Sequence, residues 1–369
     1  MRVAPKNEQH AVPTIRDIAA LVGVHKATVS AVLNGGRSTA RVSEATRKRI
    51  IETAKELRYS PNAMARGLKM VRFKSLGLAF NYQDPSWITS DQYGTALLTG
   101  IIMAASRVGY NITHFYKAWQ DAEHSAAGFR GQGIDGFLII APVLGSDIVH
   151  GLSALGIPLV VISAVPSEPG IPSVRLDNPL GIRLALEHLF HLGHRKIAYI
   201  SGASDQFDAL VRRETYFKVM AEAGIPIAPG YFVNLDDIPG EERTWDVIDE
   251  TYGSDSTYRC MQRLLRLPDP PTAVITAGAG IAEPVLYAAR DTGVRVPEEL
   301  SVVGFDDTPS APHVPPPLTT IRQPLVEMGQ CAARLLISLV ERTPIAELTH
   351  IFEPELILRK STGPAPKKA

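Results

Sequence analysis

From Ser75 onward the chain alternates short, β-rich apolar runs with helix-length amphipathic stretches, and this alternation restricts the possible fold more than any other feature. The predicted strands are residues 75–80, 110–115, 136–141, 158–163, 196–201, 272–277 and 300–305. The predicted helices between them are residues 95–108, 180–192, 208–223 and 281–292. Continuous hydrophobicity along the strands is typical of a parallel sheet that helices cover on both faces. Two blocks of this alternation predict two doubly wound α/β lobes.

Glycines and polar segments indicate where the predicted elements end. A glycine that is expected to end the helix follows several of the helical runs, namely at Gly109, Gly193, Gly224 and Gly293. Residues 227–256 break the alternation and are acidic, so we expect a long loop or insertion there. The polar residues 361–369 are expected to form a disordered tail.

The net charge of zero conceals a strong asymmetry along the chain. Residues 1–75 carry fifteen Lys or Arg against five Asp or Glu, a net charge of about +10, so the rest of the chain is about −10. A basic end on an acidic body is typical of a protein that binds nucleic acid through that end. A solvated basic surface gives the same count, so charge alone leaves both interpretations open.

Composition excludes several classes of protein. Of the 369 residues 45% are hydrophobic, too many for a disordered chain and enough for two or three domains. The longest apolar stretches, such as the one from Gly136, are about half as long as a membrane-spanning helix, and the first thirty residues contain no secretory signal. Cys260 and Cys331 form neither a disulfide framework nor a metal-ligand spacing. We therefore expect a cytoplasmic protein without membrane contact and without a cofactor.

Residues 14–36 carry the most specific motif in the chain. Helices are predicted over about residues 15–21 and 26–33, and Thr14 is a candidate N-cap for the first. A helix-turn-helix needs a small residue where its helices approach, a glycine in the turn and a branched apolar residue that holds the second helix on the first. Counted from Ile15 as position one, these residues are needed at positions five, nine and fifteen. The chain has Ala19, Gly23 and Val29 there. This spacing and the basic charge predict a DNA-binding helix-turn-helix rather than an ordinary helical hairpin.

A third helix and a short helical segment follow the motif. The third helix is predicted to begin at Ser43, which is a good N-cap. Its apolar stripe consists of Ile50, Ile51, Ala54 and Leu57. Pro61 can start a further helix over residues 62–68, but a helix this short is not stable alone. Another molecule or segment must therefore order it.

These residues carry a family resemblance. Residues 14–69 resemble the DNA-binding domain and hinge of the lactose/galactose-repressor family of bacterial transcription regulators, and the hinge string YSPNAMARGLK is especially similar to that of purine-repressor-type members. In the body, the strings EHLFHLGHRKIAYISG, PDPPTAV, RVPEELSVVGFDD and PPLTTIRQPLVEMG also resemble family segments. The resemblance covers nearly the whole chain. It implies a helix-turn-helix head and a periplasmic-binding-protein-like α/β body of two doubly wound parallel-sheet lobes.

By this resemblance, the second helix enters the major groove and its first residues face the base edges. Lys26, Ala27 and Ala31 occupy the positions that read sequence, and Lys26 can donate to guanine O6 or N7. Many members have Arg in place of Ala31, and His25 stands where a Ser or Thr cap is usual. A capping or surface role is the alternative for each expected phosphate contact. Those contacts are Thr14, Thr28, Ser30 and Asn34.

Leu68 matches the leucine of the family's hinge helix. In the family, two hinge helices of a dimer meet at the operator centre, and this leucine wedges into the minor groove and bends the DNA. A lone leucine is usually a core residue, but so short a helix cannot bury one internally. Arg66 and Lys69 are then expected beside backbone phosphates, with Asn62 as a further hinge contact.

The resemblance also implies that the body binds a small-molecule effector between its lobes. Arg213, in the string RRETYFKVM, matches an effector-binding arginine, and Asp306 matches an acid that accepts hydrogen bonds from the effector. Tyr252 falls where an aromatic ring stacks on the ligand. Tyr93, together with Trp87, is expected to form the opposing wall. Ordinary packing is the alternative for each aromatic residue.

One departure from the family pattern bears on the effector. Gly278 and Ala279 stand where many sugar-responsive members have an Asn-Asp pair, whose aspartate binds sugar hydroxyls. Loss of that acceptor makes an ordinary neutral hexose a weaker candidate. A sugar derivative, a phosphorylated or acidic compound, a nucleobase-like or more apolar effector, or no small effector at all, stay open.

The sequence therefore predicts a transcription regulator, most simply a repressor, that binds a near-palindromic operator in double-stranded DNA as a homodimer or homotetramer. A sugar-modifying enzyme is disfavoured, because the chain has no nucleophile elbow, Walker loop or dinucleotide-binding glycine motif. His188, His191 and His194 do not share a helix face, because Gly193 ends the helix, so they predict no metal site. A periplasmic binding protein would lack the first 70 residues and carry a signal peptide.

The resemblance also sets the expected domain boundaries. The divisions are residues 12–60 for the head, 61–75 for the hinge and linker, 76–360 for the body and 361–369 for the tail. Within the body, the N-lobe is expected to comprise residues 76–175 and 321–341, and the C-lobe residues 176–320 and 345–360.

Overall fold

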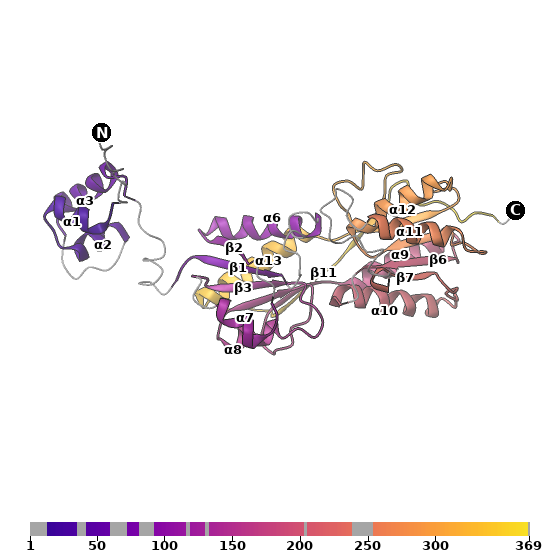
Figure 1. Cartoon of the computed structure of the whole chain (residues 1–369), viewed down its shortest axis with the longest axis horizontal. Coiled ribbons are helices and arrows are strands. Elements are labelled where there is room, and N and C mark those ends of the chain that lie inside the picture. The colour runs from indigo at the N-terminus through magenta and orange to yellow at the C-terminus, as the bar shows by residue number, and fades with distance from the viewer. Residues whose placement is uncertain are drawn as a thin grey trace, which may run out of the picture. The chain divides into compact units, whose positions relative to one another are not determined.

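The structure is a computed structural model that describes residues 13–34, 42–59, 72–80, 92–115, 119–129, 133–202, 205–237 and 254–367. The chain divides into two compact units, one ending at Lys74 and one beginning at Ser75. The first unit contains the head and the second is the body (Figure 1).

The head consists of three helices around a small apolar core. They are α1 (Ile15–Val22), α2 (Lys26–Asn34) and α3 (Glu44–Glu56). Ile18, Val29 and Ile50, one from each helix, are fully buried together. Ala19 is buried where the helices approach, and Gly23 ends α1 with φ 76°, a conformation that glycine adopts without strain. The predicted helix-turn-helix is therefore confirmed.

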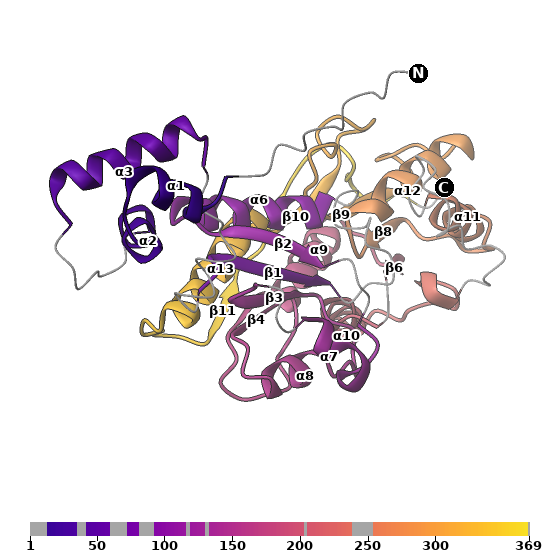
Figure 2. The same ribbon diagram turned by 60° about the vertical axis from the view of Figure 1, so that its left-hand side comes forward.

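The N-lobe is a six-stranded sheet in which neighbouring strands are parallel, in the order β11-β5-β4-β3-β1-β2. Its strands are β1 (Ser75–Phe80), β2 (Asn111–Phe115), β3 (Gly136–Ile140), β4 (Leu159–Ile162), β5 (Ser173–Leu176) and β11 (Thr349–Phe352). As Figure 2 shows, helices cover both faces. On one face lie α6 (Gln92–Arg107) and α13 (Leu325–Glu341), and on the other α7 (Ala122–Phe129) and α8 (Ile148–Ala154).

The C-lobe is a second six-stranded sheet, in the order β12-β10-β9-β8-β6-β7, with β12 antiparallel to β10. Its strands are β6 (Ile197–Ser201), β7 (Phe232–Asn234), β8 (Ala273–Thr276), β9 (Ser301–Asp306), β10 (Thr319–Arg322) and β12 (Glu355–Ile357). Its helices are α9 (Asn178–His191), α10 (Phe207–Glu222), α11 (Ser254–Leu265) and α12 (Ala279–Asp291). Tyr199 and Ile275 belong to the apolar cluster of α9 and α10, whereas Ile200 and Val274 belong to that of α11 and α12. Successive strand residues thus face opposite helix layers, as in a doubly wound sheet.

The chain crosses from one lobe to the other after β5, after β10 and after β11. Two of the expected lobe assignments were therefore wrong. Residues 321–322 belong to β10 of the C-lobe, and residues 349–352 form β11, which pairs with β5 of the N-lobe. Each predicted strand is confirmed to within one residue at either end, and each predicted helix that falls within the described residues to within three; the helix predicted over residues 62–68 lies outside them.

The expectation of a loop over residues 227–256 is confirmed for residues 227–231 and wrong for residues 232–237 and 254–256. Residues 232–234 form β7, an edge strand paired with β6, and a short 3-10 helix (Leu235–Asp237) follows it. Helix α11 begins at Ser254. Residues 238–253 lie outside the described residues.

The end of the chain is packed on the C-lobe. Ser361 is fully buried, and its hydroxyl donates to the Val302 carbonyl (2.6 Å) and accepts from the Thr319 amide (2.8 Å). The Ala365 amide donates to the Leu192 carbonyl (2.8 Å). The expected disorder is therefore wrong for residues 361–367, because hydrogen bonds rather than apolar side chains hold this segment.

Across the ranges that the structure describes, no helix combines the length and apolar character needed to cross a bilayer.

Candidate nucleic-acid interface and ligand site

Helix α2 exposes the residues that the sequence assigns to base reading. Val29 anchors α2 in the core of the head. At 100° per residue, Ala27 and Ala31 lie on the side of the helix opposite Val29. Lys26 and Ala27 are exposed, and Thr28 and Ala31 are half-buried. One face of α2 therefore holds the fold, while Lys26 and the opposite face are accessible.

Side chains fix the first turns of α1 and α2. The Thr14 amide and hydroxyl both donate to Asp17 Oδ2, at 2.7 and 2.8 Å. Thr14 is thus the N-cap of α1, and its hydroxyl proton is donated to Asp17 rather than being available to a phosphate. The Ala27 amide donates to His25 Nδ1 at 3.3 Å. The imidazole of His25 therefore caps the N-terminus of α2, as a Ser or Thr hydroxyl does in other helices.

Exposed basic side chains surround the motif on the other helices. Helices α1 and α3 and their flanking residues expose Arg16, Arg47, Lys48, Arg49, Lys55 and Arg58. Of these, Lys48 pairs with Glu52 at 3.9 Å on the surface of α3, an ion pair that contributes little to stability. Ser30 is half-buried on α2.

Several predicted residues cannot be placed. Asn62, Arg66, Leu68 and Lys69 of the hinge lie outside the described residues, as do Trp87 and Tyr252 and the side chain of Asn34. Their roles stay predictions.

In the body, polar residues gather where the carboxyl ends of strands from both sheets meet. Ser163 follows β4, Asp306 ends β9 and Gln323 follows β10. We call this group the polar cluster; its members are Tyr93, Ser163, Asn178, Asp208, Arg212, Asp306 and Gln323. This is the edge at which open parallel sheets bind ligands.

Arg212 lies at the centre of the polar cluster. It is 6% exposed, and its Nε donates to Asn178 Oδ1 (2.6 Å) while Nη1 donates to the Ala277 carbonyl (2.5 Å). Its guanidinium carbon lies 3.9 Å from the centre of the Phe305 ring, a cation–π contact. Asp208, one helical turn earlier, is 4.0 Å from Nη2.

Arg213, which the sequence assigned to this site, is not part of the polar cluster. Asp208, Arg212 and Tyr216 are spaced four residues apart and form the buried face of α10. Arg213 is rotated 100° from Arg212 and is only half-buried. The family's arginine pattern fits either of the two consecutive arginines, and the helix phase places Arg212 in the cluster.

Asp306, to which the resemblance assigns an effector contact, lies in the polar cluster. It is 8% exposed, and Gln323 Nε2 donates to its Oδ1. Its φ of 85° is in the left-handed region, a strain of the kind found at functional sites. The neighbouring Asp307 instead pairs with Arg359 (2.7 Å) and Arg322 (2.8 Å).

Tyr93, which the resemblance places in a wall of the effector site, joins the polar cluster from the N-lobe. Its hydroxyl shares a hydrogen bond with the Ser163 hydroxyl. Burial raises the pKa of Tyr93, and the charges of Asp208, Arg212 and Asp306 all act on it. The side chains of both lobes therefore meet in one electrostatic environment.

Asp208 is an acid of the polar cluster with a raised pKa. Burial raises its pKa to about 6, against the attraction of Arg212 and the hydrogen bonds of Ser163 and Asn178. The charge of Asp306 raises the pKa further. A perturbed carboxyl beside a buried cation is typical of a functional site.

Sequence reasoning missed most of the polar cluster, namely Ser163, Asn178, Asp208, Arg212 and Gln323. One signal was available for Asp208 and Arg212, because an acid and a base four residues apart on the apolar face of an amphipathic helix indicate a buried pair. The others are single polar residues that follow strands, and only the sheet order brings them together.

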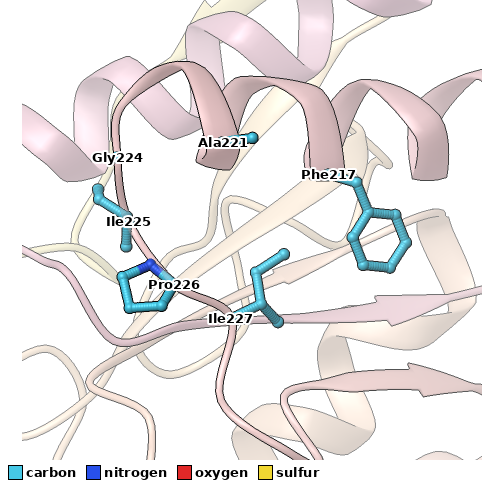
Figure 3. A pocket seen from close by; sticks show the side chains of 6 residues that line it. All are labelled: Phe217, Ala221, Gly224, Ile225, Pro226 and Ile227. Atoms are coloured by element: carbon cyan, nitrogen blue, oxygen red, sulfur yellow. The ribbon is translucent and has the colours of Figure 1, made fainter.

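A separate hollow of about 790 Å³ lies at the carboxyl end of α10 (Figure 3). It is lined by Phe217, Ala221, Gly224, Ile225, Pro226 and Ile227. None of these residues belongs to the polar cluster, and the six supply no charged group to orient a ligand.

The histidines of EHLFHLGH are engaged in structural hydrogen bonds. His194 is fully buried between the Thr272 and Ser301 hydroxyls, each 2.9 Å away, and His188 Nε2 lies 3.0 Å from the Thr362 hydroxyl. Among the described residues, no group of His, Cys, Asp or Glu is arranged to hold a metal ion.

Comparisons with known proteins agree with this division into head and body. Residues 14–62 match the sequence profile of bacterial regulatory proteins of the lacI family, and residues 186–362 that of the periplasmic binding protein-like domain. The HTH-type transcriptional regulator RegA of Clostridium saccharobutylicum is 32% identical to the chain, over 95% of the chain and 99% of RegA.

Two solved structures are similar over almost the whole chain. The complex of the transcriptional regulator CelR with cellobiose is 28% identical, with a TM-score of 0.66, and the match covers 95% of this chain and 99% of CelR. The lac repressor dimer bound to operator and the anti-inducer ONPF is 24% identical, with a TM-score of 0.80 over 96% of this chain and all of that chain. The second likeness concerns the fold alone.

Proposed function

The chain belongs to the LacI family of bacterial regulatory proteins, and on that premise we propose that it is a transcriptional repressor whose head binds operator DNA and whose body binds a small-molecule effector. The observation that carries the proposal is helix α2, with Val29 buried in the core and Lys26 and Ala27 exposed. A second helix held in this way is the element that enters the major groove. Ala31, Thr28, Ser30 and Asn34 complete its proposed DNA contacts.

The proposal includes a symmetric assembly. One head reads too few bases to specify an operator, so two heads of a homodimer bind two half-sites of a near-palindrome. The lac repressor structure, a dimer bound to operator, supports this arrangement by its likeness in fold. A homotetramer would contain two such dimers. Binding to chromosomal DNA places the protein in the cytoplasm.

The hinge residues extend the proposed interface. Leu68 of each protomer wedges into the minor groove at the operator centre, and the bend allows further contacts that offset the loss of base stacking. Arg66 and Lys69 then contact phosphates, and Asn62 lies at the start of the hinge helix. This part rests on the sequence of the hinge.

The polar cluster is the proposed effector site. Arg212 and Asp306 bind the ligand, Tyr93 contacts it from the N-lobe, and Tyr252 is a further candidate from the sequence. The cellobiose complex of CelR supports a small-molecule ligand in this kind of body. An effector changes operator affinity only as far as it prefers one arrangement of the lobes over the other.

The base-reading role of α2 can be tested by replacing one side chain. We expect Lys26→Ala to weaken binding to the cognate operator by about 1–3 kcal/mol, because a good base contact is worth this much. Lys55→Ala is the matched control, since Lys55 is also an exposed lysine but lies on α3. Titration of both variants and the parent against an operator selected from genomic fragments, at one salt concentration, measures the difference. Equal losses for the two variants would contradict the role of α2 in reading sequence.

A further inference from the structure

Buried oxygen atoms without hydrogen-bond partners occur in and beside the polar cluster. Asp208 Oδ1 and Gln323 Oε1 accept no hydrogen bond, although the two residues are only 7% and 4% exposed. The Thr276 hydroxyl, at the carboxyl end of β8, is fully buried and also lacks a partner. Buried polar atoms are nearly always satisfied in folded proteins, so these oxygens are positions that a hydrogen-bonding ligand or a water can occupy. The two cluster oxygens can only accept hydrogen bonds.

The charges of the polar cluster are also unbalanced. Tyr93 interacts electrostatically with two carboxylates, those of Asp208 and Asp306, and with one guanidinium, that of Arg212. Arg212 already donates to Asn178 and to the Ala277 carbonyl. With both carboxylates ionised, these three groups carry a net charge of −1.

The geometry points to an effector that donates hydrogen bonds and carries no negative charge: we propose that its hydroxyl or amino groups bind Asp208 Oδ1 and Gln323 Oε1, and that carboxylates and phosphates are excluded. This inference rests on the proposed effector site. A donor group satisfies the two acceptors, and an ammonium group would also balance the charge. An anion would lie beside two carboxylates that face a single, already engaged cation.

Asp208 also bears on the Gly278-Ala279 pair, at which the chain departs from the family pattern. A Cβ on Gly278 would lie 3.7 Å from Asp306 Oδ2, so position 278 adjoins the polar cluster. The aspartate of the Asn-Asp pair expected by resemblance falls at the adjacent Ala279, whereas this chain supplies its second carboxylate from α10. Asp208 thus supplies an acceptor that the Gly278-Ala279 pair lacks, and we assign it as a specificity-determining residue.

The test separates metabolites by charge. A bacterial metabolite extract is divided by ion exchange at pH 7.5 into anionic, neutral and cationic pools, and the thermal unfolding of the full chain is measured with each pool. We expect the neutral or the cationic pool to raise the midpoint and the anionic pool to leave it unchanged. Stabilisation by the anionic pool, or by no pool, would overturn the inference.

Two variants assign the effect to the proposed atoms. Asp208→Asn keeps the shape of the side chain but removes its charge, and we expect it to raise the half-saturating amount of the active pool at least tenfold. Glu214→Gln, an exposed acid on the same helix, is the matched control and should behave as the parent. An Asp208→Asn variant that responds like the parent would contradict the assignment. Operator binding by the parent is measured in parallel with and without the active pool, because its absence under both conditions would disprove the proposed function instead.

Discussion

Asp208 is a buried carboxyl, and its ionisation destabilises the folded body. Its pKa rises from 3.8 to about 6 on folding, chiefly because burial removes water from the charge. Between about pH 4 and 6 the folded chain therefore binds a proton that the unfolded chain has released. Stability from this group is present at low pH and is lost as the pH rises through 6.

This linkage gives a prediction for Asp208→Asn. The variant should be more stable than the parent at pH 8 by on the order of 3 kcal/mol, because a shift of about two pKa units is removed. The difference should vanish near pH 4. Urea unfolding at pH 4, 6 and 8 measures it, and a variant that is less stable than the parent at pH 8 would contradict the account.

Arg212 and Arg213 provide a second test at this scale. Arg212→Ala leaves Asn178 Oδ1 and the Ala277 carbonyl without the donor they now have, and Asp208 without its cation. We expect a loss of about 3 kcal/mol in the free energy of unfolding. Arg213→Ala should change it by less than about 0.5 kcal/mol, because Arg213 lies outside the polar cluster. Equal effects in urea titrations would contradict the assignment of Arg212.

Sequence reasoning identified part of the candidate site. Asp306 and Tyr93 were found because each lies in a recognisable string next to a predicted strand or helix. Sequence reasoning named Arg213 and did not consider Arg212, although a short pattern leaves the helix phase undetermined by one residue. The burial of Tyr216, four residues after Arg212, settles that phase, and burial is a property of the folded chain.

Among the elements, α6 and α13 approach each other most closely at their glycines. A Cβ on Gly329 would lie 2.3 Å from the Leu97 carbonyl oxygen, and one on Gly100 would lie 2.0 Å from the Val326 carbonyl oxygen. Neither contact can be relieved by rotating a side chain, because both partners are backbone atoms. The pairing of these helices, which covers one face of the N-lobe sheet, therefore requires glycine at both positions.

The same substitution in two helices tests this requirement. Gly329→Ala should lower the free energy of unfolding by about 1–3 kcal/mol, because the backbones must move apart. Gly280→Ala in α12 is the control, since a Cβ there meets no atom within 4 Å, and it should leave stability unchanged or raise it by up to about 1 kcal/mol. Thermal unfolding of both variants and the parent compares their stabilities. A Gly329→Ala variant as stable as Gly280→Ala would show that the helices are not in close contact.

Most of the strands that the sequence predicted are buried on both faces, such as β3, in which every residue is buried; the edge strand β2 is the exception. The strands it missed are short and lie at or near sheet edges: β5, β7, β10, β11 and β12 have three or four residues each. Only pairing with a distant partner makes them strands, as for β11 with β5. The C-terminal segment was missed for the same reason, because Ser361 is ordered by partners at Val302 and Thr319.

At the scale of the whole molecule, a basic head reads DNA and an acidic body senses a ligand. The charge asymmetry keeps phosphate binding to one end of the chain. The chain crosses between the lobes after β5, β10 and β11, so a ligand that draws the lobes together acts on both sheets at once. Regulation then needs only that the DNA-bound and free forms differ in their affinity for the ligand.

The most direct measurement is the affinity of the full-length protein for genomic fragments relative to random duplex, at one salt concentration, with and without metabolite extract. The account predicts that a few fragments containing a near-palindrome bind at least about 10³-fold more tightly than random duplex. It also predicts that the extract changes this affinity by about 5- to 150-fold. Equal binding to all fragments, in the presence and in the absence of extract, would contradict it.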